Sequence, residues 1–348
     1  MRKLEGLRDS MRTHVFAVLG EPYCLWEHPL DTLNVEFLDG FDAGYFKFVA
    51  EKSNVDGRPS EEATRAAVQL RLSYHHALET FFSLVGALIQ APTCVYGWLA
   101  KCKTEDLRAL VEAVSSSSFR FPKALQVSEL NWRTLSEAMF SGVQASGVST
   151  ADLVSGFEDL WAKLAQEFVS QSNIDEYNSL KHGFRVRAGG FKLEFGIPED
   201  PSVPDGPVKT FDFGGSHYGS SYLRVMRAGG EGRANRSLLP LRQMVNWSVE
   251  QTRLLLELIS YSIHNVVSFL KLANGAPANT VPFIVPDATE FNAPWEYSVG
   301  PVGMSMGRSF PDAVVRTTSR EELSAHMRKH LPEQLHEPGD GAESDTPK

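Results

Sequence analysis

The apolar residues of this chain change their spacing partway along it, and that change limits the folds it can adopt. Three long segments repeat apolar residues at steps of three and four, which is the buried face of an amphipathic helix. Within residues 184–230 the spacing becomes two, as in β-strands. The pattern predicts a mainly α protein, a helical bundle with a small inserted antiparallel β-sheet and a mixed C-terminal segment. The helical stripes are Tyr74, Leu78, Phe81, Val85 and Leu88; Leu153, Phe157, Leu160, Trp161, Leu164 and Phe168; and Leu255, Leu258, Ile259, Ile263, Val266 and Leu270.

Glycine and proline punctuate the chain and divide it into four parts. Alternating residues on both sides of Gly189-Gly190 predict a β-hairpin at the start of an insert spanning 184–230. We expect an irregular segment at 1–58 that packs on the core, the bundle at 59–275, a C-terminal α/β segment at 276–330 and a disordered acidic tail at 331–348. The expected helices cover residues 60–91, 104–114, 128–140, 150–168, 174–182, 248–273 and 319–330, with Thr104, Thr150 and Ser248 as N-caps, and further strands are expected at 208–213, 222–227, 281–285 and 297–306.

Composition predicts a cytoplasmic protein that does not enter a membrane. The first ten residues are polar and lack the apolar stretch of a signal peptide. The longest apolar run, residues 81–89, is too short to cross a bilayer. The three cysteines show no CxxC spacing, which argues against a disulfide framework and against a zinc site built on thiolates.

The segment 177–183 (YNSLKHG) carries the most chemistry for its length. On a helix, Asn178, Lys181 and His182 are spaced i, i+3, i+4 and share a face. An amide, an ammonium and an imidazole together can bind a phosphate, and a histidine can transfer a proton near neutral pH. The alternative is that Lys181 and His182 only complement the dipole at the C-terminus of a helix.

The same segment resembles the signature of the HEPN superfamily of helical-bundle proteins. That signature is an arginine, often followed by a polar residue, and then a histidine on the same helix. Asn178 and His182 match the second part, whereas Tyr177 stands where the family's arginine would be. The resemblance implies a protein of bacterial defence or stress response that binds RNA, and a homodimer in which two bundles face each other. In active members it implies a metal-independent endoribonuclease.

The tyrosine leaves open whether this chain is an enzyme. Cleavage would require another cation to stabilise the phosphorane, and Arg71 is the candidate. Arg71, His75 and Glu79 follow one another at steps of four along a predicted core helix. Either Arg71 supports His182 and Glu79 orients His75, or the three form a buried polar network between helices. A metal site from His75, Glu79 and His182 lacks a recognised ligand spacing, and we expect no metal and no cofactor.

Local charge adds a further indication of RNA binding. The whole chain carries a net charge of −9, but residues 181–242 contain ten basic and six acidic residues, a local charge of +4. Arg185 and Arg187 alternate with apolar residues and should face solvent next to His182, with Tyr218 and Tyr222 available to stack on bases. The alternatives are a plain solvated strand face, or a non-catalytic scaffold whose hairpin docks a protein partner.

Overall fold

The computed structural model describes residues 14–16, 24–26, 31–53, 55, 60–143, 147–199, 206–229, 236–300, 302–307, 310–311 and 318–330. The chain is mostly helical with small antiparallel sheets. One compact unit comprises residues 1–224 and 242–306, and a second comprises 225–241 and 307–348. Among the described residues, no single helix has both the length and the hydropathy to cross a bilayer, although the bent pair of residues 60–90 and 95–101 passes by length and composition.

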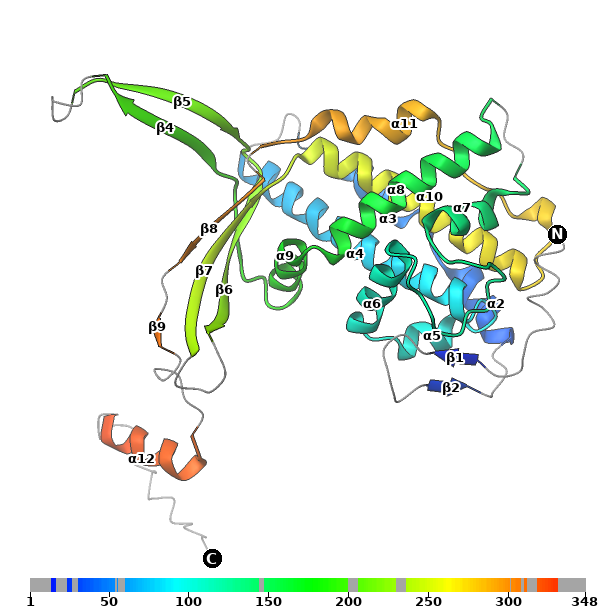
Figure 1. The fold of residues 1–348 in the computed structure, drawn as a ribbon, viewed down its shortest axis with the longest axis horizontal. Helices are drawn as coiled ribbons and strands as arrows, with labels where there is room; N and C mark the ends of the chain where they lie inside the picture. The colour runs from blue at the N-terminus through cyan, green and yellow to red at the C-terminus, as the bar shows by residue number, and fades with distance from the viewer. Residues whose placement is uncertain are drawn as a thin grey trace, which may run out of the picture. The chain divides into compact units, whose positions relative to one another are not determined.

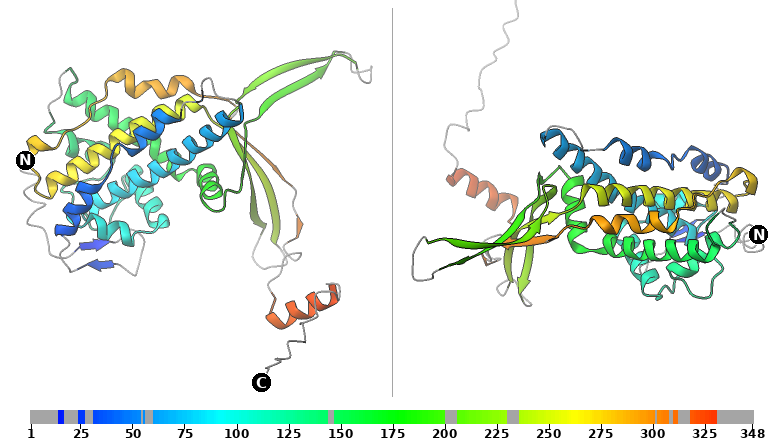
Figure 2. Two further views of the ribbon diagram at one scale, coloured as in Figure 1. Left: turned by 180° about the vertical axis from the view of Figure 1, so that it is seen from behind. Right: turned by 90° about the horizontal axis from the view of Figure 1, so that it is seen from above.

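Two long helices run alongside each other through the first unit, as Figures 1 and 2 show. They are α4 (Ser60–Gln90) and α10 (Val249–Ala273), and both predicted stripes are buried. The other helices around them are α5 (Val95–Lys101), α6 (Thr104–Ser115), α7 (Trp132–Phe140), α8 (Thr150–Val169) and α9 (Gln171–Lys181).

Aromatic side chains fill the centre of this helical unit. Phe157 stacks on Phe140 at 4.6 Å between ring centroids and contacts Trp161 at 5.3 Å. Trp161 is fully buried and donates its Nε1–H to Ser262 Oγ of α10 at 3.0 Å, so its polar edge is satisfied. Each fully buried large side chain contributes roughly 1.5–3 kcal/mol through the hydrophobic effect. The predicted stripe of α8 therefore forms a main part of the core.

The prediction that residues 1–58 are irregular is wrong for the part described between 31 and 52. These residues form α2 (Asp31–Gly40) and α3 (Tyr45–Lys52). Leu38 and Phe46 are buried in the common core, and α3 packs on α10. Because these helices are only two to three turns long, they show too few repeats for their period to be recognised, and tertiary packing stabilises them.

Helix starts differ from the predictions by up to four residues. Ser248 is the N-cap of α10 as predicted, since its Oγ accepts from Gln251 N at 3.1 Å. The cap of α8 is Ser149, one residue before Thr150, and Lys103 rather than Thr104 precedes α6. The helix predicted from residue 128 begins at Trp132, because Asn131 caps it.

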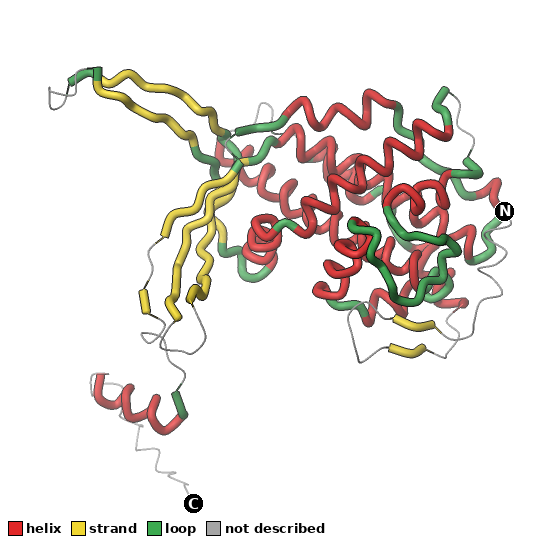
Figure 3. Tube along the Cα trace, in the orientation of Figure 1, coloured by secondary structure: helices red, strands yellow, loops and turns green. Residues whose placement is uncertain are grey.

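The predicted hairpin around Gly189-Gly190 does not form. Strand β3 (Val186–Ala188) pairs with β6 (Gly219–Gly229), whereas β4 (Lys192–Pro198) pairs with β5 (Val208–Gly215). The glycines therefore connect two different sheets, and Figure 3 shows the strands in separate groups. A Cβ on Gly190 would lie 2.2 Å from the carbonyl oxygen of Ser216, so close backbone approach requires a glycine there. The two-residue period and the Gly-Gly pair are equally compatible with a tight turn between paired strands and with a connection between two sheets.

The larger sheet has the order β3-β6-β7-β8, where β7 is Arg236–Asn246 and β8 is Gly303–Gly307, and β9 (Phe310–Pro311) also pairs with β7. The short strands β1 (His14–Phe16) and β2 (Cys24–Trp26) pair separately. The second unit contains the outer ends of β6 and β7, β9 and α12 (Arg320–His330), the predicted terminal helix.

The strand predicted at 281–285 is instead an extended segment bound to α10. Asn265 of α10 holds the backbone of Ile284 through two hydrogen bonds of 2.8 Å, and Ser268 donates to the carbonyl of Pro282 at 2.7 Å. These side chains satisfy the backbone in place of a neighbouring strand. Around it lie η2 (Ala278–Thr280), α11 (Ala288–Asn292) and η3 (Ala293–Tyr297). The acidic tail at 331–348 lies outside the described residues.

Candidate functional site

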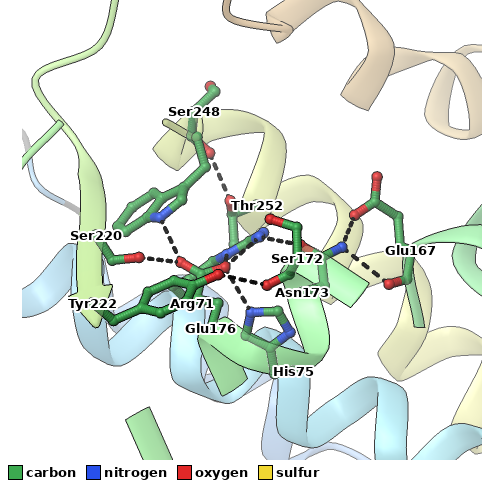
Figure 4. A network of polar contacts seen from close by, with 11 residues as sticks. Arg71, His75, Glu167, Ser172, Asn173, Glu176, Ser220, Tyr222, Ser248 and Thr252 are labelled. Carbon is green, nitrogen blue, oxygen red and sulfur yellow. Dashed lines mark hydrogen bonds and ion pairs between the residues drawn. The ribbon is translucent and has the colours of Figure 1, made fainter. Parts of the chain in front are cut away.

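A buried carboxylate, Glu176 of α9, is the centre of the main polar cluster, which Figure 4 shows. Its side chain is completely buried and accepts from four other residues. We call these residues, together with Asn173, the Glu176 network. The donors are Arg71 Nε (3.0 Å) and Nη2 (2.8 Å), His75 Nε2 (3.1 Å), Ser220 Oγ (2.6 Å) and Trp247 Nε1 (3.2 Å).

The network fixes α9 against three other segments. Arg71 and His75 come from α4, Ser220 from β6, and Trp247 from the residues just before α10. Asn173, one turn before Glu176, accepts from Arg71 Nη2 at 3.2 Å and donates to the carbonyl of Glu167 at 3.0 Å. A short helix with little apolar surface is thereby held in one orientation by charge and hydrogen bonds.

Electrostatics within the network favour one protonation state. Burial alone would raise the pKa of Glu176, but the charge of Arg71 and the hydrogen bonds from His75 and Arg71 hold that pKa well below its ordinary value. Burial and the neighbouring Arg71 charge lower the pKa of His75 despite its bond to Glu176. His75 is therefore neutral near pH 7, with its proton on Nε2, because a carboxylate only accepts.

The placement of Arg71 and His75 favours the network interpretation of the predicted α4 stripe. Both side chains are less than a tenth exposed, and the hollow beside His75 and Tyr177 measures about 20 Å³, room for one water molecule. Arg71 directs its guanidinium to Glu176, and it also lies over the rings of Tyr74 and Trp247. A phosphate group has no room to reach these two residues.

Glu79 belongs to a second, half-buried contact between α4 and α9. Its carboxylate accepts from Tyr177 Oη at 2.8 Å and from Lys181 Nζ at 3.2 Å. The hypothesis that Glu79 orients His75 is not supported, because His75 bonds Glu176 while its ring stacks on that of Tyr177 at 5.4 Å. Tyr177 therefore packs between the two helices.

The last residue of α9 and the residues that follow it form an exposed basic group, called here the α9 end. Its members are Lys181, His182, Arg185 and, in β3, Arg187. Within the described part of the chain, the side chains of His182 and Arg187 have no hydrogen-bond or ion-pair partner. Arg185 Nη2 donates to the carbonyl of Asn178 at 3.4 Å, which places its guanidinium over the helix terminus. His182 is the C-cap, followed by Gly183 in the left-handed region (φ 83°), as a helix end requires.

Helix geometry separates the two sets of residues. Asn178 follows Glu176 by two positions, about 200° around the helix, so it faces away from the buried network. Asn178 and Lys181 lie on the last turn of α9, whereas His182, predicted on the same helix face, is the C-cap and lies outside the helix. Arg71 therefore belongs to the buried Glu176 network, and His182 belongs to the exposed α9 end.

Tyr218 and Tyr222, which were expected to stack on bases, both make contacts within the protein. Tyr222 is buried and donates its hydroxyl to the carbonyl of Ser172 at 2.9 Å, so it cannot stack on a base. Tyr218 stacks on Trp247 with 6.4 Å between ring centroids. Among the described residues, no three His, Cys, Asp or Glu side chains gather as a metal-binding group.

Sequence reasoning missed the residue at the centre of the site. The helix predicted at 174–182 would put Glu176 in its first turn, where the helix dipole favours a carboxylate, but α9 begins at Gln171, which puts Glu176 in its second turn. The signal available in the sequence was the pair Arg71 and His75 on a buried helical stripe. A buried arginine requires an anion as its partner. The acidic residues that directly precede the segment 177–183 are Asp175 and Glu176, both in α9.

The fold and the site define a mostly helical protein in which a buried ionic network presents the basic end of one short helix to solvent. Comparison with known proteins finds no family model, no curated protein and no solved structure that matches this chain.

Proposed function

We propose that this protein binds RNA through the α9 end. The observation that carries the proposal is the group of exposed cations there, which follows a helix whose opposite face is fixed by the Glu176 network. Strand β3, which carries Arg187, is in turn paired with β6. Arg187 has no anionic partner among the described residues, and Arg185 bonds only a backbone carbonyl. Guanidinium groups held in this way bind phosphates without first breaking an ion pair.

The proposal concerns a local contact rather than a broad binding surface. The chain is acidic overall, which disfavours nonspecific attraction of a polyanion over the whole surface. Lys181 contributes less than the arginines, because Glu79 already neutralises it at 3.2 Å. The proposed contact therefore depends mainly on Arg185 and Arg187, with His182 and Asn178 beside them.

Metal-independent RNA cleavage is the second candidate. It is favoured by the position of Arg185, whose guanidinium reaches back to Asn178 at the same helix end as His182. In this version Arg185, rather than Arg71, supplies the positive charge that Tyr177 cannot supply, and His182 transfers the proton. The helical bundle and the bacterial defence role that the HEPN resemblance implies belong to this proposal.

Fluorescence anisotropy with a labelled single-stranded RNA tests binding. We expect the double variant Arg185→Gln/Arg187→Gln to raise Kd at least tenfold and to reduce the salt slope by about 1.4, since each lost phosphate contact removes about 0.7. The matched control is Arg65→Gln/Arg133→Gln, which removes the same charge from exposed arginines of α4 and α7. Equal losses in both double variants would show that net charge, not this site, governs binding.

Cleavage is tested separately on the same RNA in the presence of EDTA. His182→Ala should abolish it without changing Tm, because the imidazole is exposed and has no partner among the described residues. Cleavage that persists in His182→Ala would exclude this histidine as the catalytic group. If no RNA binds even at low salt, both RNA proposals fail and a scaffold for a protein partner becomes the better explanation.

A further inference from the structure

The hairpin of β4 and β5 exposes large apolar side chains that the described chain leaves uncovered. Every described residue of β4 is exposed, and so are residues 208–213 of β5. These strands pair with each other in a separate two-stranded sheet. An isolated two-stranded hairpin is at best marginally stable in water, so an apolar face on one normally packs against something.

Strand register places these side chains on a single face. Phe195 is directly opposite Phe211, and paired residues of antiparallel strands point to the same side. Alternation adds Leu193 and Ile197 of β4 and Phe213 of β5 to that side. Lys209, directly opposite Ile197, lies at the end of the same side, with its Nζ 5.3 Å from the centroid of the Phe211 ring. The five apolar side chains, called here the hairpin face, are exposed as follows: Leu193 39%, Phe195 55%, Ile197 48%, Phe211 41% and Phe213 60%.

The opposite side of the hairpin is polar and already satisfied. Lys192 binds Glu194 at 2.6 Å and Asp212 at 2.8 Å, and so bridges two carboxylates that lie directly across from each other. Residues 191–215 contain five acidic and two basic residues, a net charge of −3. This charge disfavours RNA as the occupant of the hairpin face, and the exposed apolar side chains favour an apolar protein surface.

The size of the hairpin face fits a second copy of the same hairpin. With about 200 Å² for each aromatic side chain and slightly less for the others, the exposed fractions amount to about 450 Å² per chain. Two such faces packed as layers about 10 Å apart would bury about 900 Å². That is below the roughly 1,200–2,000 Å² of stable specific interfaces and in the range of weak, transient ones, as expected of a dimer that dissociates at micromolar concentration.

We infer that the protein forms a homodimer by packing the hairpin faces of two chains against each other. A second copy presents the same five apolar side chains, so a two-fold axis makes the contact self-complementary. The packing covers Phe195 and Phe213 on both chains and leaves the polar side of each hairpin in water. This interface is separate from the bundle-to-bundle contact that the HEPN resemblance implies.

Sedimentation velocity of the full chain from 1 to 100 µM tests the inference. The wild type should shift from monomer to dimer across this range. Phe195→Ser/Phe213→Ser should remain monomeric at 100 µM, with Kd raised at least tenfold, because it removes the two most exposed rings of the face. The matched control is Val208→Ser, which truncates an equally exposed apolar residue on the polar side and should leave Kd unchanged.

A measurement on the unmodified protein keeps the test independent of any effect on folding. Hydrogen exchange of the backbone amides in residues 192–198 and 208–215 should slow between 1 and 100 µM, while exchange in α4 stays constant. A monomer at 100 µM overturns the inference. So does a dimer that forms equally well in the double serine variant, because its interface would lie elsewhere, the bundle included.

Discussion

Replacing Glu176 by Gln is the most direct test of how this fold is held together. The substitution keeps the shape of the side chain and removes only its charge. Arg71, which is 7% exposed, would then be a buried cation without a counterion. Breaking a buried ion pair by removing one partner costs about 3–5 kcal/mol, because the remaining charge stays desolvated.

The contacts of the two carboxylate oxygens make the expected cost more specific. Oε2 accepts from Arg71 and His75, whereas Oε1 accepts from Ser220 and Trp247. A glutamine would keep its oxygen toward the cation and turn its NH₂ toward the second pair. The serine hydroxyl can rotate and accept, but an indole N–H only donates and loses its partner. We therefore expect a loss of about 4 kcal/mol, or roughly 8 °C in Tm.

Urea unfolding followed by circular dichroism measures this loss as a change in the free energy of unfolding. Lys181→Met is the control, since its exposed ion pair with Glu79 should contribute no more than about 1 kcal/mol. The double variant Arg71→Met/Glu176→Met leaves no charge buried and should be more stable than Glu176→Gln alone. A Glu176→Gln protein within about 1 kcal/mol of wild type would refute the reasoning.

Two further predictions concern pH and packing. The pKa values of His75 and Glu176 are both lowered in the folded state, so acid protonates the unfolded chain first, below about pH 6.5 for histidine and about 4.3 for glutamate. Tm should therefore fall from pH 7.5 to 5.0, and less steeply in His75→Gln; an identical slope in both proteins would contradict this role of His75. Gly86→Ala would place a Cβ 2.2 Å from the ring of Trp98 and should cost about 1–3 kcal/mol in urea unfolding, although alanine is the better helix former. Gly142→Ala, with open space around its Cβ, is the control, and an equally stable Gly86→Ala would show that the ring moves aside.

The long helices were predictable because each repeats its apolar period over many turns. The stripe from Tyr74 to Leu88 lies on α4, and the stripe from Leu255 to Leu270 lies on α10. Repetition makes the signal independent of any single residue. The short helices α2 and α3 lack such repetition, and their formation depends on contacts with residues more than two hundred positions away, such as that of Asn34 of α2 with Asn274.

Strand pairing was less predictable than strand position. Period and glycine content located β3 and β4 correctly, but not their partners. The deciding contact is Asn246, whose amide bonds both the N–H and the carbonyl of Phe191 at 2.8 Å. Those residues are 55 positions apart, and nothing in the local pattern relates them. Strand pairing therefore depends on hydrogen bonds from side chains that are distant in the sequence, and patterns of neighbouring residues do not reveal these bonds.

The exposed and the buried halves of the candidate site depend on each other. The residues exposed at the end of α9 are presented in one orientation because Glu176 fixes the helix from its other face and because β3, which carries Arg187, pairs with β6. α9 buries little apolar surface of its own, chiefly Leu180, so packing alone would hold it weakly. The ionic network supplies the orientation that hydrophobic contact does not. A rigid base beneath an exposed cluster reduces the conformational entropy lost on binding, so the buried Glu176 network can influence what the exposed cations bind.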